Sequence, residues 1–218
     1  MTKSRLMNWL RNLRDPKKLT LPPPGLTAEP ADSFDEAVDP GSVSPIRPNI
    51  KLNVGCGTDY REGFINIDGS NTLPRVDKII DISSASLLPH FTNGEMDYIL
   101  ANDIIEHHYH WEAVRILKEF HALLRKDGQL EIRVPDAEFI IATDAFSISN
   151  KLNLLFGGQD VPQGRDPKMD ESRKHFPQFF CHKYGWTMDA MKKELCDIGF
   201  SSVRCQRADT NFIAYAKK

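Results

Sequence analysis

Two glycines and one carboxylate carry the first chemical signal in the chain. Gly55 and Gly57 follow directly on the short apolar run 50–54, and Asp68 ends a second such run eleven residues after Gly57. Glycine lacks the Cβ atom that would hold a ligand away from the main chain, and it accepts the positive φ of a tight turn. A carboxylate at the tip of the next strand can accept hydrogen bonds from both hydroxyls of a ribose. The pattern predicts a nucleoside-binding site.

The same stretch argues against a dinucleotide. A dinucleotide fingerprint has a third glycine three positions after the second, at the start of a helix that receives a pyrophosphate. This position is Tyr60 here. The ribose acid of such a fingerprint follows about 20 residues on, whereas Asp68 follows Gly57 much sooner. A ligand with adenosine but no phosphate fits better, and a nicotinamide-dependent reductase remains an alternative.

At this point the sequence resembles a known family. Residues 52–57 read Leu-Asn-Val-Gly-Cys-Gly, and residues 63–68 read Gly-Phe-Ile-Asn-Ile-Asp. Both match, position by position, the signature of a small bacterial branch of the class I S-adenosylmethionine-dependent methyltransferases. The resemblance implies S-adenosylmethionine as the cofactor and methyl transfer as the activity.

The resemblance also implies which residues contact the cofactor. These are Asn53, Gly55, Cys56, Gly57, Asp68, Asp81 and Asn102. The family has an acid near the adenine edge at the position of Asp81, for which an ordinary strand-end residue is the alternative. Asn102 and Asp103 follow the fourth apolar run, at the carboxyl end of a strand, where parallel sheets bind ligands.

The candidates for a catalytic base are His107 and Asp103. Methyl transfer from a sulfonium is a direct displacement, so the protein mainly positions the reactants and supplies a base where the acceptor is protonated. Many members of the family have histidine at the position of Asp103, so the family does not decide which group is the base. His107 could instead cap the next helix or hold a loop. Asp136 and His182 are further candidates, with structural roles favoured for both.

The run 106–110, Glu-His-His-Tyr-His, raises the question of a metal site. Zinc sites often use clustered histidines. No second set of Cys or His has matching spacing, and the resembled family carries Glu-His here without a metal. The sequence therefore predicts no metal site.

Short apolar runs and two helices must position these residues. Strands are expected at 50–54, 64–67, 76–82, 96–100, 129–134, 202–207 and 211–216. Apolar residues at helical spacing predict a helix over 111–125, with Gly128 as its left-handed cap. A last helix is expected between Thr187 and Gly199. The three residues 208–210 are too few for a parallel crossover and predict a hairpin. Together with the resemblance, this predicts an α/β, Rossmann-like class I methyltransferase fold, whose mostly parallel seven-stranded sheet has an antiparallel last strand.

The first crossover is unusually short. Only the nine residues 55–63 join the first two strands, where parallel neighbours normally need about a dozen. The connection is therefore expected to be a single turn or irregular, and another segment must cover the pocket. The N-terminal region and residues 150–180 are the candidates.

The 218 residues are expected to form three parts. Residues 1–18 carry leucines at helical spacing among Lys and Arg, which predicts a basic amphipathic helix that lies on a membrane surface or packs on the catalytic domain. Residues 19–48 are rich in proline and acids and read as a linker or strap. Residues 49–218 form the S-adenosylmethionine-binding domain, in which residues 137–181 are an insertion that builds the substrate wall.

Composition excludes several classes of protein. The net charge of −2 and the pI near 6.4 argue against a nucleic-acid binder. No apolar run approaches the roughly 18 residues that span a bilayer. Four cysteines without a Cys-x-x-Cys pair indicate reduced thiols and a cytoplasmic protein, with peripheral contact at the inner membrane face through residues 1–18 as an option.

The sequence does not indicate an oligomeric state, and it leaves the methyl acceptor open. The expected acceptor is a small molecule or a glycan or lipid precursor. The alternative is a protein that binds S-adenosylmethionine or a related nucleoside without turnover.

Overall fold

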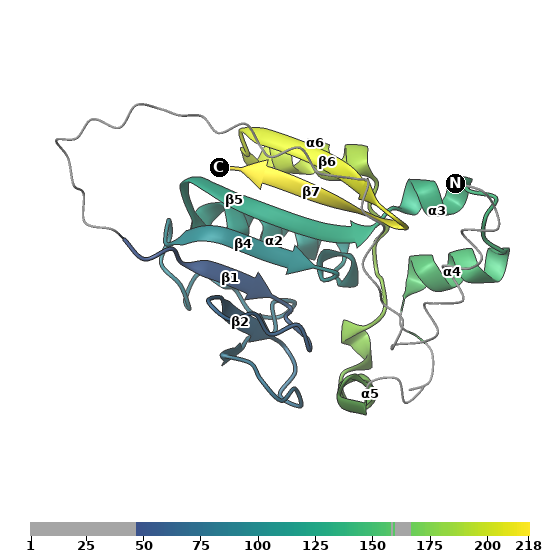
Figure 1. Ribbon diagram of the computed structural model, residues 1–218, viewed down its shortest axis with the longest axis horizontal. Coiled ribbons are helices and arrows are strands. Elements are labelled where there is room, and N and C mark those ends of the chain that lie inside the picture. Colours follow the sequence, from purple (N-terminus) through teal and green to yellow (C-terminus); the bar gives the residue numbers. More distant parts are fainter. Residues whose placement is uncertain (1–46, 158, 160–166) are drawn as a thin grey trace, which may run out of the picture. The chain divides into compact units, whose positions relative to one another are not determined.

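A single seven-stranded sheet organises the described part of the chain (Figure 1). The computed structural model describes residues 47–157, 159 and 167–218, with 167 and 168 as backbone alone. Two units, 1–46 and 47–218, divide the chain, and the described residues all belong to the second. The basic helix expected at 1–18 and nearly all of the linker expected at 19–48 lie outside the described residues.

The strands lie in the order β3-β2-β1-β4-β5-β7-β6. Their bounds are β1 (Lys51–Val54), β2 (Ile65–Asp68), β3 (Lys78–Ile79), β4 (Met96–Asn102), β5 (Leu124–Pro135), β6 (Ser202–Ala208) and β7 (Asn211–Lys217). Neighbours from β3 to β5 pair in parallel, whereas β7 runs antiparallel to both β5 and β6. The predicted Rossmann-like, mostly parallel sheet with an antiparallel last strand is confirmed, as is the final hairpin.

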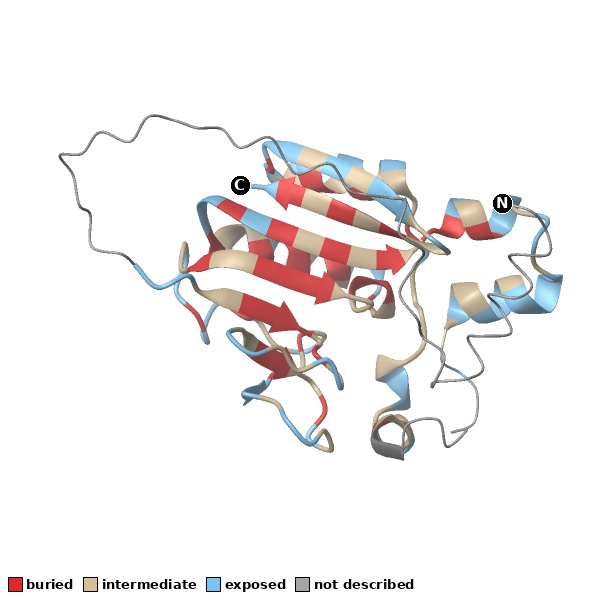
Figure 2. Ribbon diagram, in the orientation of Figure 1, coloured by how far each residue is buried: buried red, intermediate tan, exposed pale blue. Residues whose placement is uncertain are grey.

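Two helices, α2 (His110–Leu123) and α6 (Met188–Ile198), pack against each other and against the sheet. Figure 1 shows both on the far side of the strands. The helix side of the sheet is apolar: buried residues of β7 alternate with partly exposed ones, as Figure 2 shows. The predicted limits of α6 are confirmed, because the Thr187 hydroxyl accepts from the Ala190 amide and Gly199 has a φ of 116°.

The short segments complete the described fold. They are η1 (Ile105–His107), α3 (Ala137–Ala142), α4 (Ile148–Phe156), α5 (Pro167–His175) and η2 (Pro177–Phe179). Within the residues that the structure describes, no helix is both long and apolar enough to cross a membrane.

The connection from β1 to β2 contains turns but no helix, as its length predicted. Buried Asn66 holds it together. Its side-chain oxygen accepts from the Asn53 side chain at 3.0 Å and the Arg61 amide at 2.9 Å, while its NH2 group donates to the Arg61 carbonyl at 3.0 Å and to Asp77 at 3.1 Å. In a crossover helix the backbone groups of this connection would pair with one another. Here some of them pair with side-chain amides instead.

The expected end of the 111–125 helix was wrong. The helix ends at Leu123, and Asp127 rather than Gly128 has the positive φ, 65°. Gly128 is needed for a different reason: a Cβ there would lie 3.1 Å from the Met96 carbonyl oxygen of the neighbouring strand and 3.0 Å from that of Arg125. The absence of a side chain lets the start of β5 approach β4 closely.

Candidate functional site

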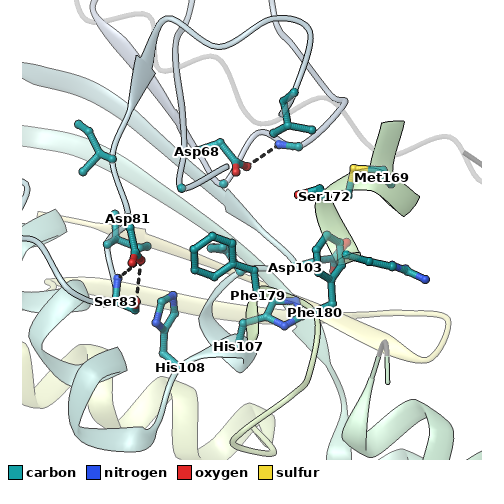
Figure 3. Close-up of a pocket in the computed structure, with 18 of the residues that line it drawn as sticks. Asp68, Asp81, Ser83, Asp103, His107, His108, Met169, Ser172, Phe179 and Phe180 are labelled. Atoms are coloured by element: carbon teal, nitrogen blue, oxygen red, sulfur yellow. Dashed lines mark hydrogen bonds between the residues drawn. The ribbon is translucent and has the colours of Figure 1, made fainter. Parts of the chain in front are cut away.

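A cavity of about 290 Å³ lies at the carboxyl ends of the parallel strands. Residues that follow β1, β2, β3 and β4 line one part of it, and residues from the segment 169–183 line another (Figure 3). The order of the sheet reverses between β1 and β4, which is where open α/β sheets bind ligands. The strands therefore bring their polar end residues to one place.

Asp68 joins the first two strand ends. One carboxylate oxygen accepts from the Gly57 amide at 2.9 Å, and the other accepts from the Ser70 amide at 2.8 Å. Each carboxylate oxygen has two acceptor sites, so both retain one for a ligand. Burial raises the pKa of Asp68 above its ordinary value, and the amides of Ser70 and Gly57 oppose this. The two amides fix the orientation of the carboxylate at the edge of the cavity.

The two glycines of the motif differ in their surroundings. Both have positive φ, 65° at Gly55 and 52° at Gly57, and both line the cavity. A Cβ on Gly55 would lie 2.6 Å from the Ile104 Cδ1 atom, whereas the nearest side-chain atom to a Cβ on Gly57 is the Met169 methyl carbon at 4.0 Å. Gly55 is therefore required by packing as well as by conformation, whereas at Gly57 only the conformation favours glycine.

Asp81 also lines the cavity, but its carboxylate is already bound. One oxygen accepts from the Ser83 amide at 2.9 Å and the Ser83 hydroxyl at 2.6 Å, and the other accepts from the Ser84 hydroxyl at 2.9 Å. Burial alone would raise the pKa of Asp81, yet the hydrogen bonds from Ser83 and Ser84 hold it below its ordinary value. Asp81 is therefore an ionised acid that shapes the turn after β3.

Three residues of the predicted cofactor set do not line the cavity: Asn53, Cys56 and Asn102. Asn53 is 3% exposed and holds the β1–β2 connection through the Asp59 carbonyl and Asn66. Cys56 is buried, with 4% of its surface exposed. Their contribution to cofactor binding stays a prediction, and the structure gives Asn53 a role in shaping the loop.

The burial of Cys56 yields a testable reactivity. Burial, with Asp68 and Asp77 nearby, raises the pKa of its thiol to about 12, so the nucleophilic thiolate is scarce at pH 8. Cys196 is exposed. In the folded protein, a thiol reagent such as Ellman's reagent should react with Cys196 at least ten times faster than with Cys56, as peptide mapping can measure. Equal rates would show that the loop around Cys56 opens readily, and unfolding in urea should abolish the difference.

Asp103, a predicted base, is engaged elsewhere. Its carboxylate forms a two-pronged ion pair with the Arg133 guanidinium of β5, whose Nε lies 2.9 Å from one oxygen. The Asp103 amide also donates to the Arg133 carbonyl at 2.8 Å, and Asp103 has a φ of 52°. The pairing with arginine occupies both carboxylate oxygens and fixes the orientation of the group. The geometry favours a positioning role for Asp103 at the end of β4.

His107 borders the cavity together with His182. Its Nδ1 atom lies 3.1 Å from the Cys181 carbonyl oxygen, and its ring lies 4.9 Å from the His182 ring, edge to face. Burial and His182 lower the pKa of His107 to about 4. His107 is therefore neutral at pH 7, with a lone pair on Nε2 but little basicity. The contact with Cys181 agrees with the structural alternative, in which His107 holds a loop in place.

Asp136, the remaining strand-end candidate, is fully buried and lies outside the cavity lining. It caps α3 by accepting from the Phe139 amide at 3.1 Å, and it pairs with Arg207 at 3.2 Å. These contacts give it a structural role.

The sequence named residues 150–180 as a candidate cover for the pocket, and side chains from 169–180 do line the opposite wall of the cavity. It did not predict the contacts that hold them there. The Ser172 hydroxyl on α5 donates to the Ser70 hydroxyl at 2.9 Å, which ties this wall to the loop after β2. Phe179 packs on Gly69, where a Cβ would lie 3.0 Å from its ring. The bulky side chains in 176–180 were the signal for an apolar wall, but nothing in the sequence indicates where they dock.

His108 also faces the cavity and was not predicted to. It is 4% exposed, and neither ring nitrogen has a hydrogen-bond partner among the described residues. Burial and nearby Lys183 lower its pKa to about 4. Arg173 is another lining residue with a buried, unpartnered nitrogen, Nε, within the described part of the chain. A ligand in the cavity could supply hydrogen-bond partners for the two ring nitrogens of His108 and for Nε of Arg173.

Solved structures with the same fold are S-adenosylmethionine-dependent methyltransferases. One from Archaeoglobus fulgidus is 13% identical, with a TM-score of 0.53 over 78% of this chain and 86% of that one. One from Methanosarcina mazei is 15% identical, with a TM-score of 0.51 over 79% and 94%. One from Mesorhizobium loti is 11% identical, with a TM-score of 0.50 over 78% and 90%.

No protein-family model matches the chain, and no curated protein matches it either. At these low identities the structural likeness establishes the fold.

Proposed function

We propose that this chain binds S-adenosylmethionine in the cavity at the carboxyl ends of β1, β2 and β4 and transfers its methyl group to an acceptor. The observation that carries the proposal is the contact between Asp68 and the Gly57 amide, which sets a half-buried carboxylate beside backbone that carries no side chain. The fold it shares with methyltransferases supports the same assignment.

The charges of the cavity suit this cofactor. Asp68 offers two acceptor sites for the ribose hydroxyls, and charge-assisted hydrogen bonds of this kind are the strong ones. The apolar wall around Phe179 and Leu73 can cover the adenosyl part. Arg173 has a buried nitrogen that lacks a partner among the described residues, and it could pair with the carboxylate of the methionyl part.

The transfer itself is a single displacement. A lone pair of the acceptor forms the bond to the methyl carbon while the carbon–sulfur bond breaks, and its electron pair stays on sulfur to give neutral S-adenosylhomocysteine. His107 has a pKa of about 4, and the carboxylate of Asp103 is engaged by Arg133, so neither is well placed to take a proton from the acceptor. This favours an acceptor that is already nucleophilic or whose proton leaves to solvent. We infer a small molecule or a glycan or lipid precursor as the acceptor.

A second candidate function is binding of the nucleoside without turnover. The pairing of Asp103 with Arg133 favours it, because it engages a carboxylate that was predicted as a base. Product formation separates the two functions: an enzyme transfers labelled methyl groups from S-adenosylmethionine to a component of a cell extract, whereas a binding protein does not.

Binding is tested by titrating pure protein with S-adenosylhomocysteine in a calorimeter and by thermal unfolding. At a ligand concentration of about 100 times the dissociation constant, unfolding should cost roughly 2.7 kcal/mol more, which raises Tm by several degrees for a domain of this size. NAD serves as the matched control, because its pyrophosphate finds no glycine-rich helix start here. Stabilisation by NAD alone would support the reductase instead and overturn the proposal.

A further inference from the structure

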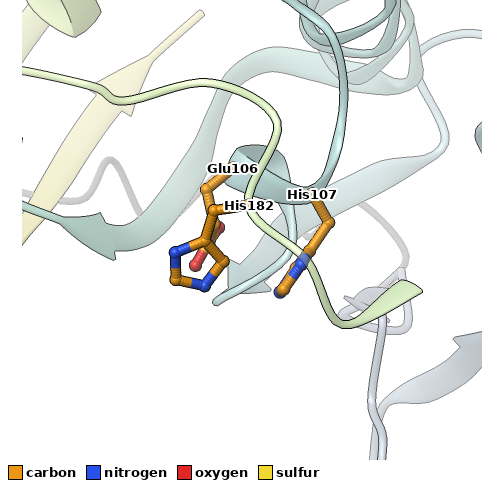
Figure 4. A group of neighbouring side chains, drawn as sticks. All are labelled: Glu106, His107 and His182. Carbon is orange, nitrogen blue, oxygen red and sulfur yellow. The ribbon is translucent and has the colours of Figure 1, made fainter. Parts of the chain in front are cut away.

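Three side chains that can bind metals converge beside the cavity: Glu106, His107 and His182 (Figure 4). One donor atom from each lies within 4.8 Å of the other two. Glu106 and His107 belong to η1, whereas His182 comes from the segment after η2, 75 residues later in the chain. The fold therefore assembles a set of two imidazoles and one carboxylate that no local motif contains.

Glu106 is the least expected member of this set. Its side chain is 2% exposed, and neither carboxylate oxygen has a hydrogen-bond partner in the described parts of the chain. A buried polar atom without a partner costs free energy, and nearly all such atoms in folded proteins are satisfied by a protein group, a water or an ion. Something absent from the polypeptide should satisfy this carboxylate.

Both imidazoles are oriented as metal ligands usually are. Nδ1 of His107 lies 3.1 Å from the Cys181 carbonyl oxygen, and Nδ1 of His182 lies 3.1 Å from that of Leu154. A carbonyl oxygen only accepts, so each Nδ1 carries the proton and each Nε2 carries a lone pair. Backbone carbonyls commonly fix the tautomer of a metal-binding histidine in this way.

Two contacts fix the backbone around Glu106 and His182. The Glu106 carbonyl accepts from the Lys183 amide at 2.8 Å, which joins η1 to the segment of His182. Gly157 packs on the His182 ring, where a Cβ would lie 2.5 Å from Nε2. Gly157 has a φ of 66° and a ψ of −162°, a conformation that is nearly restricted to glycine. The close approach sets the position of the His182 ring.

We propose that Glu106, His107 and His182 bind one divalent transition-metal ion at the inner edge of the cavity. Two imidazole nitrogens and one carboxylate oxygen suit zinc, iron(II) and similar ions better than magnesium or calcium, which prefer oxygen ligands. Zinc bonds to such donors are about 2.0–2.2 Å long, which sets tetrahedral donors about 3.4 Å apart. Donors that lie up to 4.8 Å apart here must therefore approach one another by about 1 Å or more when the ion binds. Asp103 is adjacent but is held by Arg133.

A metal ion can reach the three side chains through the cavity, and it can act there on the acceptor. His107 and His182 line the cavity whereas Glu106 does not, so an ion held by the three would lie at the edge of the cavity. An ion there would hold an oxygen or nitrogen of the acceptor and lower its pKa, which compensates for the weak bases around it. This role rests on the proposed methyl transfer, but binding of the ion does not.

Zinc binding by untagged protein, dialysed against a chelator, provides the test. Calorimetry without any nucleoside should find one Zn²⁺ per chain. Glu106→Gln, His107→Ala and His182→Ala should each weaken binding by at least about 100-fold, since loss of outer-shell partners alone costs 10–100-fold. His90→Ala is the matched control: His90 is exposed and lies outside the cluster, and its removal should leave Zn²⁺ binding unchanged. Absence of a stoichiometric site, or equal binding by all four variants, overturns the proposal.

A measurement on the unsubstituted protein guards against variants that fail to fold. Zn²⁺ should shift the side-chain Nε2 resonances of His107 and His182 in a ¹⁵N spectrum and leave those of His90 in place. Shifts at His90 with none at the other two would contradict the assignment. Titration with S-adenosylhomocysteine of the same metal-stripped protein reports on the proposed function separately, because that ligand is held by Asp68 and needs no ion.

Discussion

Asp68→Ala should reduce the affinity for S-adenosylhomocysteine by at least about 100-fold, since hydrogen bonds to a charged group contribute roughly 1.5–3 kcal/mol each and Asp68 can accept two from a ribose. The substitution also removes the acceptor for the Gly57 and Ser70 amides, which hold the loop beside the ligand. Both effects weaken binding of the nucleoside. Calorimetric titration measures the loss, and labelled methyl transfer should fall with it.

Two further variants show whether the carboxylate itself is responsible. Asp68→Asn keeps the shape and one acceptor oxygen but removes the charge, so its affinity should lie between those of the wild type and Asp68→Ala. Asp59→Ala is the matched control, because Asp59 is in the same loop but exposed, pairs with Arg61, and lies outside the cavity lining. Native affinity in Asp68→Ala, with an unchanged far-UV spectrum, would exclude the proposed ribose site.

The sheet was predictable because its signals are local. Apolar runs of strand length, a capping Thr187 and a three-residue connection before the last strand each restrict the chain within a few residues. The hairpin of β6 and β7 followed from the length of its connection alone. Gly128 shows what local signals cannot predict. It was predicted as a helix cap, whereas glycine is needed there because of the Met96 carbonyl of another strand.

The site was predictable only where its residues share one motif. Gly55, Gly57 and Asp68 lie within fourteen residues of each other and line the cavity as expected. Asn53 and Cys56 belong to the same motif, yet their side chains hold the loop or fill the core. A motif fixes which residues are close in sequence, but the burial of each side chain decides whether it faces the ligand.

The segment that forms the opposite wall was among the predicted candidates, but its contacts and the histidine cluster could not be predicted because they depend on long-range contacts. Ser172 meets Ser70 across 102 residues, and α5 carries no apolar periodicity that would have indicated its position. The run 106–110 looked incomplete as a metal site because His182, the missing donor, is far away in the sequence. Only the tertiary fold joins them.

Gly55→Ala should destabilise the fold by roughly 2–5 kcal/mol, the sum of a strained positive φ and of overpacking against Ile104. The backbone has a φ of 65°, and the new Cβ would lie 2.6 Å from the Ile104 Cδ1 atom and 2.8 Å from Cγ1. Ile104 itself packs against the core, and its own Cβ, which side-chain rotation does not move, would lie 3.1 Å from the new atom. Urea unfolding gives the free energy, and Tm should fall by about 2–4 °C for each kcal/mol.

Gly57→Ala separates the two contributions, because Gly57 also has a positive φ, 52°, but has no neighbour closer than the Met169 methyl carbon. It should cost only the strain of the backbone, about 1–3 kcal/mol, yet weaken nucleoside binding because its Cβ enters the cavity. The double variant Gly55→Ala/Ile104→Ala should be more stable than the sum of the single variants predicts, by roughly 0.5–3 kcal/mol. If the two glycine variants lost equal stability and the double variant showed no coupling, the contact with Ile104 would not be the reason for glycine at position 55. The conformation of the turn alone would then require it.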